Sequence, residues 1–217
     1  MRQPMISPSL MCADFLNLQG DLDIFARAGI EYLHIDVMDG SFVPNYTLGT
    51  DFVKRVREYS SIPLDIHLMI DEPDRKLDWF EFGEGDYVSI HYESTAHVQR
   101  VLAQIKARGA KTMLAINPAT PICVLEDVID DLDAVLIMTV NPGYAGQKLV
   151  PSTIDKIRRV HEMYPGIDIE ADGNCSFENA KLMRQAGANI FVAGSSSVFL
   201  KGNSIEDNIK TLREYIL

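Results

Sequence analysis

The segment 31-EYLHIDVMDG-40 decides the fold, because it joins a short apolar run to polar residues at its carboxyl end. Apolar side chains at Leu33, Ile35 and Val37 predict a strand that is buried in a sheet. The amphipathic segment 51-DFVKRVREYS-60 follows and predicts a helix. Together, the two segments form one strand-helix unit.

The same pairing recurs along the whole chain. The expected strands are residues 4–10, 31–37, 63–69, 86–92, 111–117, 133–140, 167–173 and 190–194. The expected helices are residues 16–29, 51–60, 73–83, 96–109, 121–130, 151–164, 177–187 and 204–216. Eight such units predict a single-domain α/β protein, a (β/α)8 TIM barrel that spans residues 1–217. An open, doubly wound sheet is the alternative, and the number of units favours the barrel.

Composition agrees with a folded, globular chain, since 47% of the residues are hydrophobic and 24% are charged. The net charge of −11 disfavours nucleic acids and anionic membranes as partners, although a local site could still hold a small anion. The three cysteines have no CxxC spacing, which favours a reducing compartment. The sequence has no recognisable signal peptide and no apolar run of transmembrane length. We therefore expect a soluble, cytoplasmic protein.

Polar residues collect where the expected strands end. The active site of a barrel of this kind lies at the carboxyl ends of its strands. His34 and Asp36 end the second strand, His67 lies near the end of the third, and Asp172 ends the seventh. Two imidazoles and two carboxylates are a suitable ligand set for one divalent ion such as Zn²⁺, Fe²⁺, Co²⁺ or Mn²⁺. The alternative is four unrelated structural residues, and their common position at strand ends argues against it.

Two further aspartates have other expected roles. Asp65 shares a face of its strand with His67 and could orient a ligand imidazole. Asp39 precedes Gly40 and is expected to shape the turn that leaves the second strand.

Two loops are suited to a phosphate group. The segment 141-NPGYAGQ-147 has two glycines that let backbone N–H groups approach an anion, and 194-GSSS-197 follows the last strand, where many barrels bind phosphate. Neither loop contains Lys or Arg, so backbone N–H groups and helix dipoles would provide the binding. Met38, Met69 and Met138 lie near strand ends, either as adaptable core residues or as a dry lining over the site.

At these positions the sequence resembles the ribulose-phosphate 3-epimerases and their allulose-6-phosphate relatives. The matching segments are 7-SPSL-10, 34-HIDVMDGSFVPN-45, 64-LDIHLM-69, 138-MTVNPGYAGQ-147, 171-ADG-173 and 192-VAGSS-196. They span nearly the whole chain in order. The resemblance implies a barrel of the ribulose-phosphate-binding type and a metal-dependent 3-epimerase of a ketose phosphate.

The resemblance also implies a role for each matching residue. His34, Asp36, His67 and Asp172 match the metal ligands, and Asp36 and Asp172 also match the paired acid and base. Met38, Met69 and Met138 match methionines that cap the reacting centre. The residues that match or adjoin the substrate and phosphate positions are Ser9, His67, Gly143, Tyr144, Ala145, Gly146, Gly173, Asn174, Gly194, Ser195 and Ser196. We also expect a homo-oligomer, because exposed barrel faces often assemble.

Three segments depart from the common pentose-phosphate pattern. They are 8-PSLMC-12, 143-GYAG-146 and 172-DGNC-175, where the family commonly has Asp-Gly-Gly at the last. All three look more like the allulose-6-phosphate branch, and Asn174 adds a side chain beside the expected phosphate. The sequence therefore favours D-allulose 6-phosphate and D-fructose 6-phosphate as the substrate pair. D-ribulose 5-phosphate and D-xylulose 5-phosphate are the alternative.

Two other protein classes fit less well. Related decarboxylases have an Asp-x-Lys-x-x-Asp pattern, whereas 65-DIHLMID-71 places His67 where the lysine would be. A non-catalytic sugar-phosphate binder would be expected to lack a ligand or an acid-base residue, and all four are present. If the site is real, Asp36 must face the barrel mouth while Ile35 and Val37 face the helices.

Overall fold

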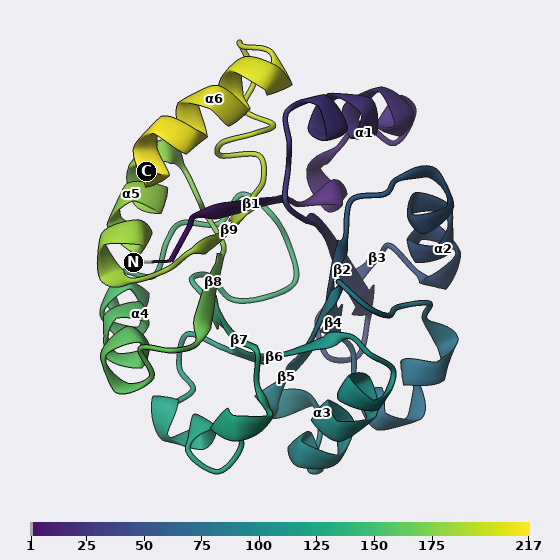
Figure 1. Ribbon diagram of the computed structural model, residues 1–217, viewed down its shortest axis with the longest axis vertical. Helices are drawn as coiled ribbons and strands as arrows, with labels where there is room; N and C mark the ends of the chain where they lie inside the picture. The colour runs from purple at the N-terminus through teal and green to yellow at the C-terminus, as the bar shows by residue number, and fades with distance from the viewer. Residues whose placement is uncertain (1) are drawn as a thin grey trace.

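Eight parallel strands curl around a central axis, with helices on the outside, in the computed structural model, which describes residues 2–217 (Figure 1). The parallel strands are β1 (Met5–Pro8), β2 (Leu33–Asp39), β4 (Leu64–Met69), β5 (Tyr87–His91), β6 (Lys111–Ile116), β7 (Ala134–Met138), β8 (Asp168–Asp172) and β9 (Ile190–Ala193). Neighbours in the sheet follow the chain order from β2 to β9, and β1 pairs with β9. This closed order confirms the predicted (β/α)8 barrel, because a doubly wound sheet would reverse its strand order at a switch point.

The barrel has a thin seam between its first two strands. β1 pairs with β9 over four residues, from Met5 with Ile190 to Pro8 with Ala193. Within residues 2–217, the backbone pairing between the β1 side and β2 is an isolated bridge from Ser9 to His34. A two-stranded hairpin was not predicted: β3 (Tyr46–Thr47) runs antiparallel to the end of β2.

Six of the eight expected helices form, each within two residues of its predicted bounds. They are α1 (Leu18–Arg27), α2 (Thr50–Tyr59), α3 (Val98–Ala107), α4 (Ser152–Met163), α5 (Phe177–Ala186) and α6 (Ile205–Ile216). Short 3-10 turns, η1 (Leu10–Cys12) and η4 (Tyr92–Ser94), precede α1 and α3. No helix in the described part of the chain is long and apolar enough to cross a membrane.

The helix predicted over residues 73–83 is wrong. This segment forms two 3-10 turns, η2 (Pro73–Arg75) and η3 (Leu77–Trp79), and then becomes extended. Phe80 and Phe82 are both buried although they are two positions apart. Such a pair cannot share one face of an α-helix but can be accommodated by irregular, extended chain.

The helix predicted over residues 121–130 is also wrong. η5 (Ile122–Leu125) and η6 (Ile129–Asp131) replace it. An α-helix here would place acidic residues four positions apart, Glu126 with Asp130 and Asp127 with Asp131. Like charges at this spacing repel, and negative charge at a helix carboxyl end opposes the helix dipole.

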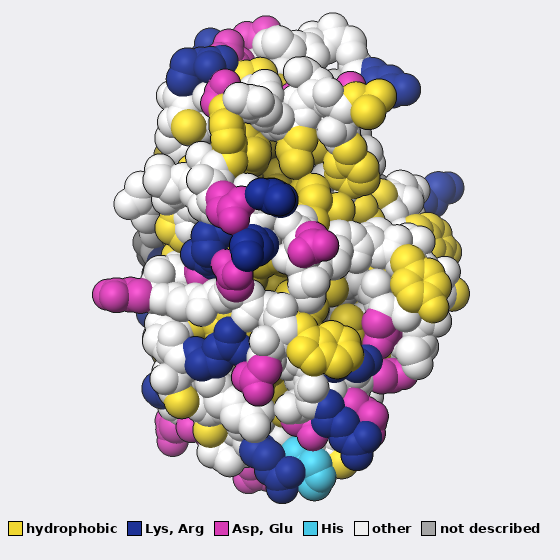
Figure 2. Space-filling model, turned by 90° about the vertical axis from the view of Figure 1, so that its right-hand side faces the viewer, with side chains coloured by type: hydrophobic (Ala, Val, Ile, Leu, Met, Phe, Trp, Pro, Cys, Tyr) yellow, Lys and Arg dark blue, Asp and Glu magenta, His cyan; other side chains and the backbone are white. Residues whose placement is uncertain are grey.

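Each strand divides its side chains between two apolar layers. Ile35 and Val37 lie in the apolar layer between strands and helices, together with Val53 of α2, as predicted. The inner layer fills the barrel and consists of Tyr32, Tyr87, Met113, Ala115, Ala134, Leu136, Met138 and Ile190. The outer surface seen in Figure 2 carries scattered charges of both signs and an apolar area in its upper half. The interior is therefore packed, and space for a ligand opens at the mouth.

Candidate metal centre and substrate pocket

The four predicted ligand residues meet at the carboxyl-terminal mouth of the barrel. One donor atom from each of His34, Asp36, His67 and Asp172 lies within 4.8 Å of all the others. Asp36 Oδ1 is 3.3 Å from His34 Nε2 and 3.6 Å from His67 Nδ1, and His67 Nδ1 is 3.5 Å from Asp172 Oδ2. Donors about 2.1 Å from one tetrahedral ion would lie about 3.4 Å apart. The spacing of the cluster fits a single divalent ion.

Hydrogen bonding in the cluster also fits an ion. His67 Nδ1 is buried and has no hydrogen-bond partner among the described residues, although it faces two carboxylates. A buried polar atom without a partner is costly in a folded protein, and coordination to a metal would satisfy it. Burial favours the neutral form of Asp36, but the adjacent His34 and His67 outweigh it and hold the pKa of that carboxyl well below its ordinary value.

The carboxylate of Asp65 contacts His34 on the side of the ring that faces away from the cluster. Asp65 Oδ2 is 2.6 Å from His34 Nδ1 and accepts a hydrogen bond of 2.9 Å from the Ser7 hydroxyl. His34 therefore presents Nε2 to the cluster. The sequence placed Asp65 near a ligand imidazole, and the structure shows that this imidazole belongs to His34.

The turn after β2 has the expected form. Asp39 Oδ1 accepts hydrogen bonds of 3.0 Å from the backbone N–H groups of Ser41 and Phe42. Gly40 has a φ of 73°, and a Cβ there would lie 2.3 Å from the Tyr46 ring, so only glycine fits.

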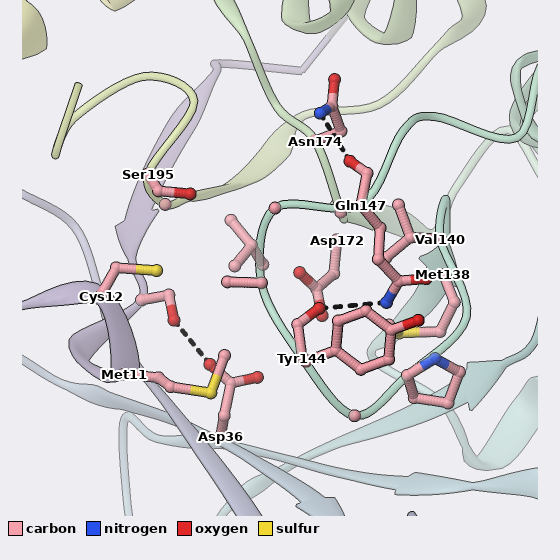
Figure 3. Close-up of a pocket in the computed structure, with 18 of the residues that line it drawn as sticks. Met11, Cys12, Asp36, Met138, Val140, Tyr144, Gln147, Asp172, Asn174 and Ser195 are labelled. Carbon is pink, nitrogen blue, oxygen red and sulfur yellow. Dashed lines mark hydrogen bonds between the residues drawn. The ribbon is translucent and has the colours of Figure 1, made fainter. Parts of the chain in front are cut away.

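A pocket opens above the cluster, and Figure 3 shows Asp36 and Asp172 reaching it from different strands. The Ser9 hydroxyl donates a hydrogen bond of 2.6 Å to Asp36 Oδ2. Thioethers line the same space, from the three predicted methionines and from Met11, which was not predicted. The predicted loop residues also line it, namely Gly143, Tyr144, Ala145, Gly146, Gly173, Asn174, Gly194, Ser195 and Ser196.

The backbone at Gly173 and Asn174 is unusual. Their φ values are 118° and 46°, in the region that favours glycine and, less strongly, asparagine. A Cβ at Gly173 would lie 2.5 Å from the Val140 side chain. The Asn174 amide donates a 2.7 Å hydrogen bond to the Gln147 carbonyl (Figure 3). The Asn174 side-chain oxygen accepts a hydrogen bond of 2.6 Å from Asn179. The Asn174 side chain thus ties the 141–147 loop to α5.

Several site residues were missed by the sequence analysis. Glu170 is fully buried beside Asp65, and burial and that carboxylate raise the pKa of Glu170 well above its ordinary value. Its position two residues before Asp172 on β8 was the available signal, since it places both on one face. His91 ends β5, and its Nε2 lies 2.8 Å from His67 Nε2. The signal in the sequence was a histidine at the end of an apolar strand, the same kind of position as that of the predicted ligands.

The chain forms a (β/α)8 barrel with a His-Asp cluster and an open pocket at the carboxyl ends of its strands. This is where enzymes of the barrel fold have their active sites. The ribulose-phosphate 3 epimerase family model matches residues 5–199. The ribulose-phosphate 3-epimerase of Bacillus subtilis is 44% identical over 196 residues, covering 88% of this chain and 90% of that protein. The Escherichia coli ribulose-phosphate 3-epimerase is 41% identical over 201 residues, covering 90% and 89%.

The chain therefore belongs to the ribulose-phosphate 3-epimerase family and is an epimerase that acts on a carbohydrate phosphate. Proteins outside this family share the same fold. The 3-hexulose-6-phosphate synthase of Salmonella typhimurium superimposes with a TM-score of 0.68, covering 98% of each chain at 13% identity. At that identity, the likeness concerns the barrel alone.

Proposed function

We propose that this protein interconverts D-ribulose 5-phosphate and D-xylulose 5-phosphate. The observation that carries the proposal is the identity of 38–44% to proteins named ribulose-phosphate 3-epimerase from bacteria, an archaeon and eukaryotes. The names of these relatives support the pentulose phosphate alternative better than the preference for D-allulose 6-phosphate drawn from the sequence. That preference depended partly on Asn174, whose side chain is engaged with Gln147 and Asn179 rather than reserved for substrate.

One divalent ion is proposed as the cofactor, held by His34, Asp36, His67 and Asp172. The ion would supply Lewis acidity that stabilises negative charge developing on the C2 and C3 oxygens of the substrate. Zn²⁺, Fe²⁺, Co²⁺ and Mn²⁺ all suit two imidazoles and two carboxylates.

Asp36 and Asp172 are proposed to move the proton at C3. This carbon lies beside the C2 carbonyl, so loss of its proton gives an enediolate. One aspartate removes the proton from one face and the other returns a proton to the opposite face, which inverts C3. The low pKa of Asp36 supports its presence as a carboxylate, and Ser9 orients it through Oδ2. Methionine side chains nearby offer no competing acidic proton.

The phosphate is proposed to bind between the 143–146 segment, Gly173 and the 194–196 segment. Residues of all three segments line the pocket. Tyr144 is half exposed at the rim, where it can contact the bound sugar phosphate.

Turnover of the two substrate pairs tests the proposal. Purified protein, supplied in turn with each candidate ion, is assayed with D-ribulose 5-phosphate and with D-allulose 6-phosphate. We expect kcat/KM for the pentulose phosphate to be higher by about tenfold or more, the size of effect that one mismatched substrate group can produce. A higher kcat/KM for the hexulose phosphate would overturn the substrate assignment and leave the epimerase class intact.

A further inference from the structure

His67 is connected to a chain of polar groups that runs away from the candidate metal centre. Its Nε2 lies 2.8 Å from Nε2 of His91, and the two rings meet edge to edge, with centroids 5.0 Å apart and planes inclined by 21°. His91 Nδ1 lies 3.3 Å from Glu93 Oε2. The side chain of His91 is 0% exposed and that of Glu93 is 25% exposed, so the chain leads from the interior toward solvent.

The outer end of this chain is fixed in place. Glu93 Oε1 accepts a hydrogen bond of 3.0 Å from the backbone N–H of Asn117 and another from the Thr120 hydroxyl. Lys156 donates to the carbonyl oxygens of the same 117–120 loop, at 2.8, 2.8 and 2.6 Å. The His91 ring also packs against Phe42, with centroids 4.7 Å apart. Neither His91 nor Glu93 can therefore turn freely.

The donors and acceptors in the chain can be ordered in one consistent way. A carboxylate only accepts, so Glu93 requires hydrogen on His91 Nδ1. Neutral His91 then has a lone pair on Nε2, which accepts the hydrogen on His67 Nε2. His67 Nδ1 is left with its lone pair, and this is the atom that faces Asp36 and Asp172 without a hydrogen-bond partner in residues 2–217.

We propose that His91 and Glu93 are positioning residues that hold His67 in the tautomer and orientation in which Nδ1 binds the metal ion. This inference rests on the metal site of the proposed function. It assigns the two ligand histidines separate supports: Asp65 holds His34, and the His91–Glu93 pair holds His67. Loss of such outer partners typically weakens metal binding by about 10- to 100-fold.

Metal affinity of matched variants tests this. Co²⁺ binding is measured by competition with a coloured chelator and by the visible spectrum of the bound ion. His91→Leu should weaken Co²⁺ affinity by about 10- to 100-fold and alter the spectrum. His91→Gln should restore most of the affinity, because an amide can accept from His67 and donate to Glu93. His97→Leu makes the same change at an exposed residue that starts α3, and it should leave affinity and spectrum unchanged.

The outcomes separate this inference from the proposed function. Wild-type affinity and spectrum in His91→Leu would overturn the positioning role while the metal site stands. If wild-type protein binds no Co²⁺, the metal site itself is wrong. Should His91→Leu not fold, Glu93→Ala changes only the partly exposed end of the chain. A loss of affinity in Glu93→Ala supports the inference, and unchanged affinity overturns it.

Discussion

Asp36 receives more directed contacts than its place on a buried strand would suggest. Ser9 donates to one of its oxygens, and His34 and His67 approach the other. An aspartate in such surroundings is held in one orientation and in its charged form. Asp172 comes from the far side of the barrel and is less enclosed, with a side chain 14% exposed. The two carboxylates thus reach the pocket from different strands and differ in exposure.

Replacing either aspartate by asparagine should stop epimerisation. We expect kcat to fall by about 10²- to 10⁴-fold with metal in excess, because one of the two proton-transfer groups is lost. Each variant should still exchange the C3 hydrogen of one epimer with solvent deuterium, since the remaining aspartate serves one face. Mass spectrometry of recovered substrate measures this exchange. Asp127→Asn, at an exposed residue, is the control. Normal turnover in Asp36→Asn or Asp172→Asn would rule out the two-base mechanism.

Metal affinity should weaken as pH falls. Burial opposes charge on His34 and His67, yet Asp65 and Asp36 raise the pKa of His34, and Asp172 and Asp36 raise the pKa of His67, above the ordinary 6.5. These carboxylates therefore favour protonation of the metal-free imidazoles, and the ion must compete with protons for them. Affinity should drop about tenfold per pH unit for each proton displaced. Calorimetry between about pH 6 and about pH 8 measures it. A constant affinity would contradict these shifts.

At the scale of elements, the connection after β8 contains Gly173, whose backbone conformation favours glycine. Gly173→Ala should lower Tm and raise KM, because φ is 118° and the new Cβ would meet Val140. Gly202→Ala is a matched control, with a φ of 110° and no atom within 4 Å of its Cβ. The control should show only the backbone cost, about 1–3 kcal/mol, and an unchanged KM. Equal effects on KM in both variants would show that the Val140 contact is irrelevant to substrate binding.

Sequence periodicity was sufficient to predict the regular strands and helices, but it predicted the wrong structure for the connections at residues 73–83 and 121–130. The apolar strands and six helices could be predicted because each has one repeating pattern of burial. Residues 73–83 and 121–130 could not, since their structure depends on the packing of Phe80 and Phe82 and on repulsion among surface acids. The positions of His34, Asp36 and His67 near expected strand ends, together with that of Asp172, were sufficient to predict that the four residues meet. His91 and Glu170 were overlooked although each lies in an expected strand, and the contacts between strands show which groups they face.

At the scale of the whole molecule, metal binding should stabilise the fold. An ion at 100 times its Kd adds about 2.7 kcal/mol to the free energy of unfolding. Thermal denaturation with and without added ion measures this as an increase in Tm. His34→Gln should lose most of the increase, and His97→Gln, at an exposed position, should retain it. An equal increase in both variants would place the stabilising ion elsewhere.

The stability of the metal-free protein should fall as pH rises, whereas metal affinity should increase as pH rises. The pKa values of His34 and His67 are raised in the folded state, so their contribution is fully present below 6.5 and is lost as pH rises through the raised values. Metal-free protein should therefore lose stability over the same pH range in which metal affinity increases. Denaturant unfolding with a chelator present measures this trend. Greater stability of the metal-free protein at the higher pH would contradict it.

The seam between β1 and β2 has a consequence for how the barrel opens. The candidate ligands on β2 and β4 lie on one side of the seam, whereas Asp172 on β8 connects through β9 to β1 on the other side. An ion shared by these strands would join the two edges, which are otherwise linked by the isolated Ser9–His34 bridge and by side-chain hydrogen bonds from Ser9 to Asp36 and from Ser7 to Asp65. Amide hydrogens of β1 and β2 should then exchange with deuterated water far more slowly when the ion is bound, while those of β5 to β7 change little. The cofactor would serve as the closing contact of the barrel as well as its catalyst.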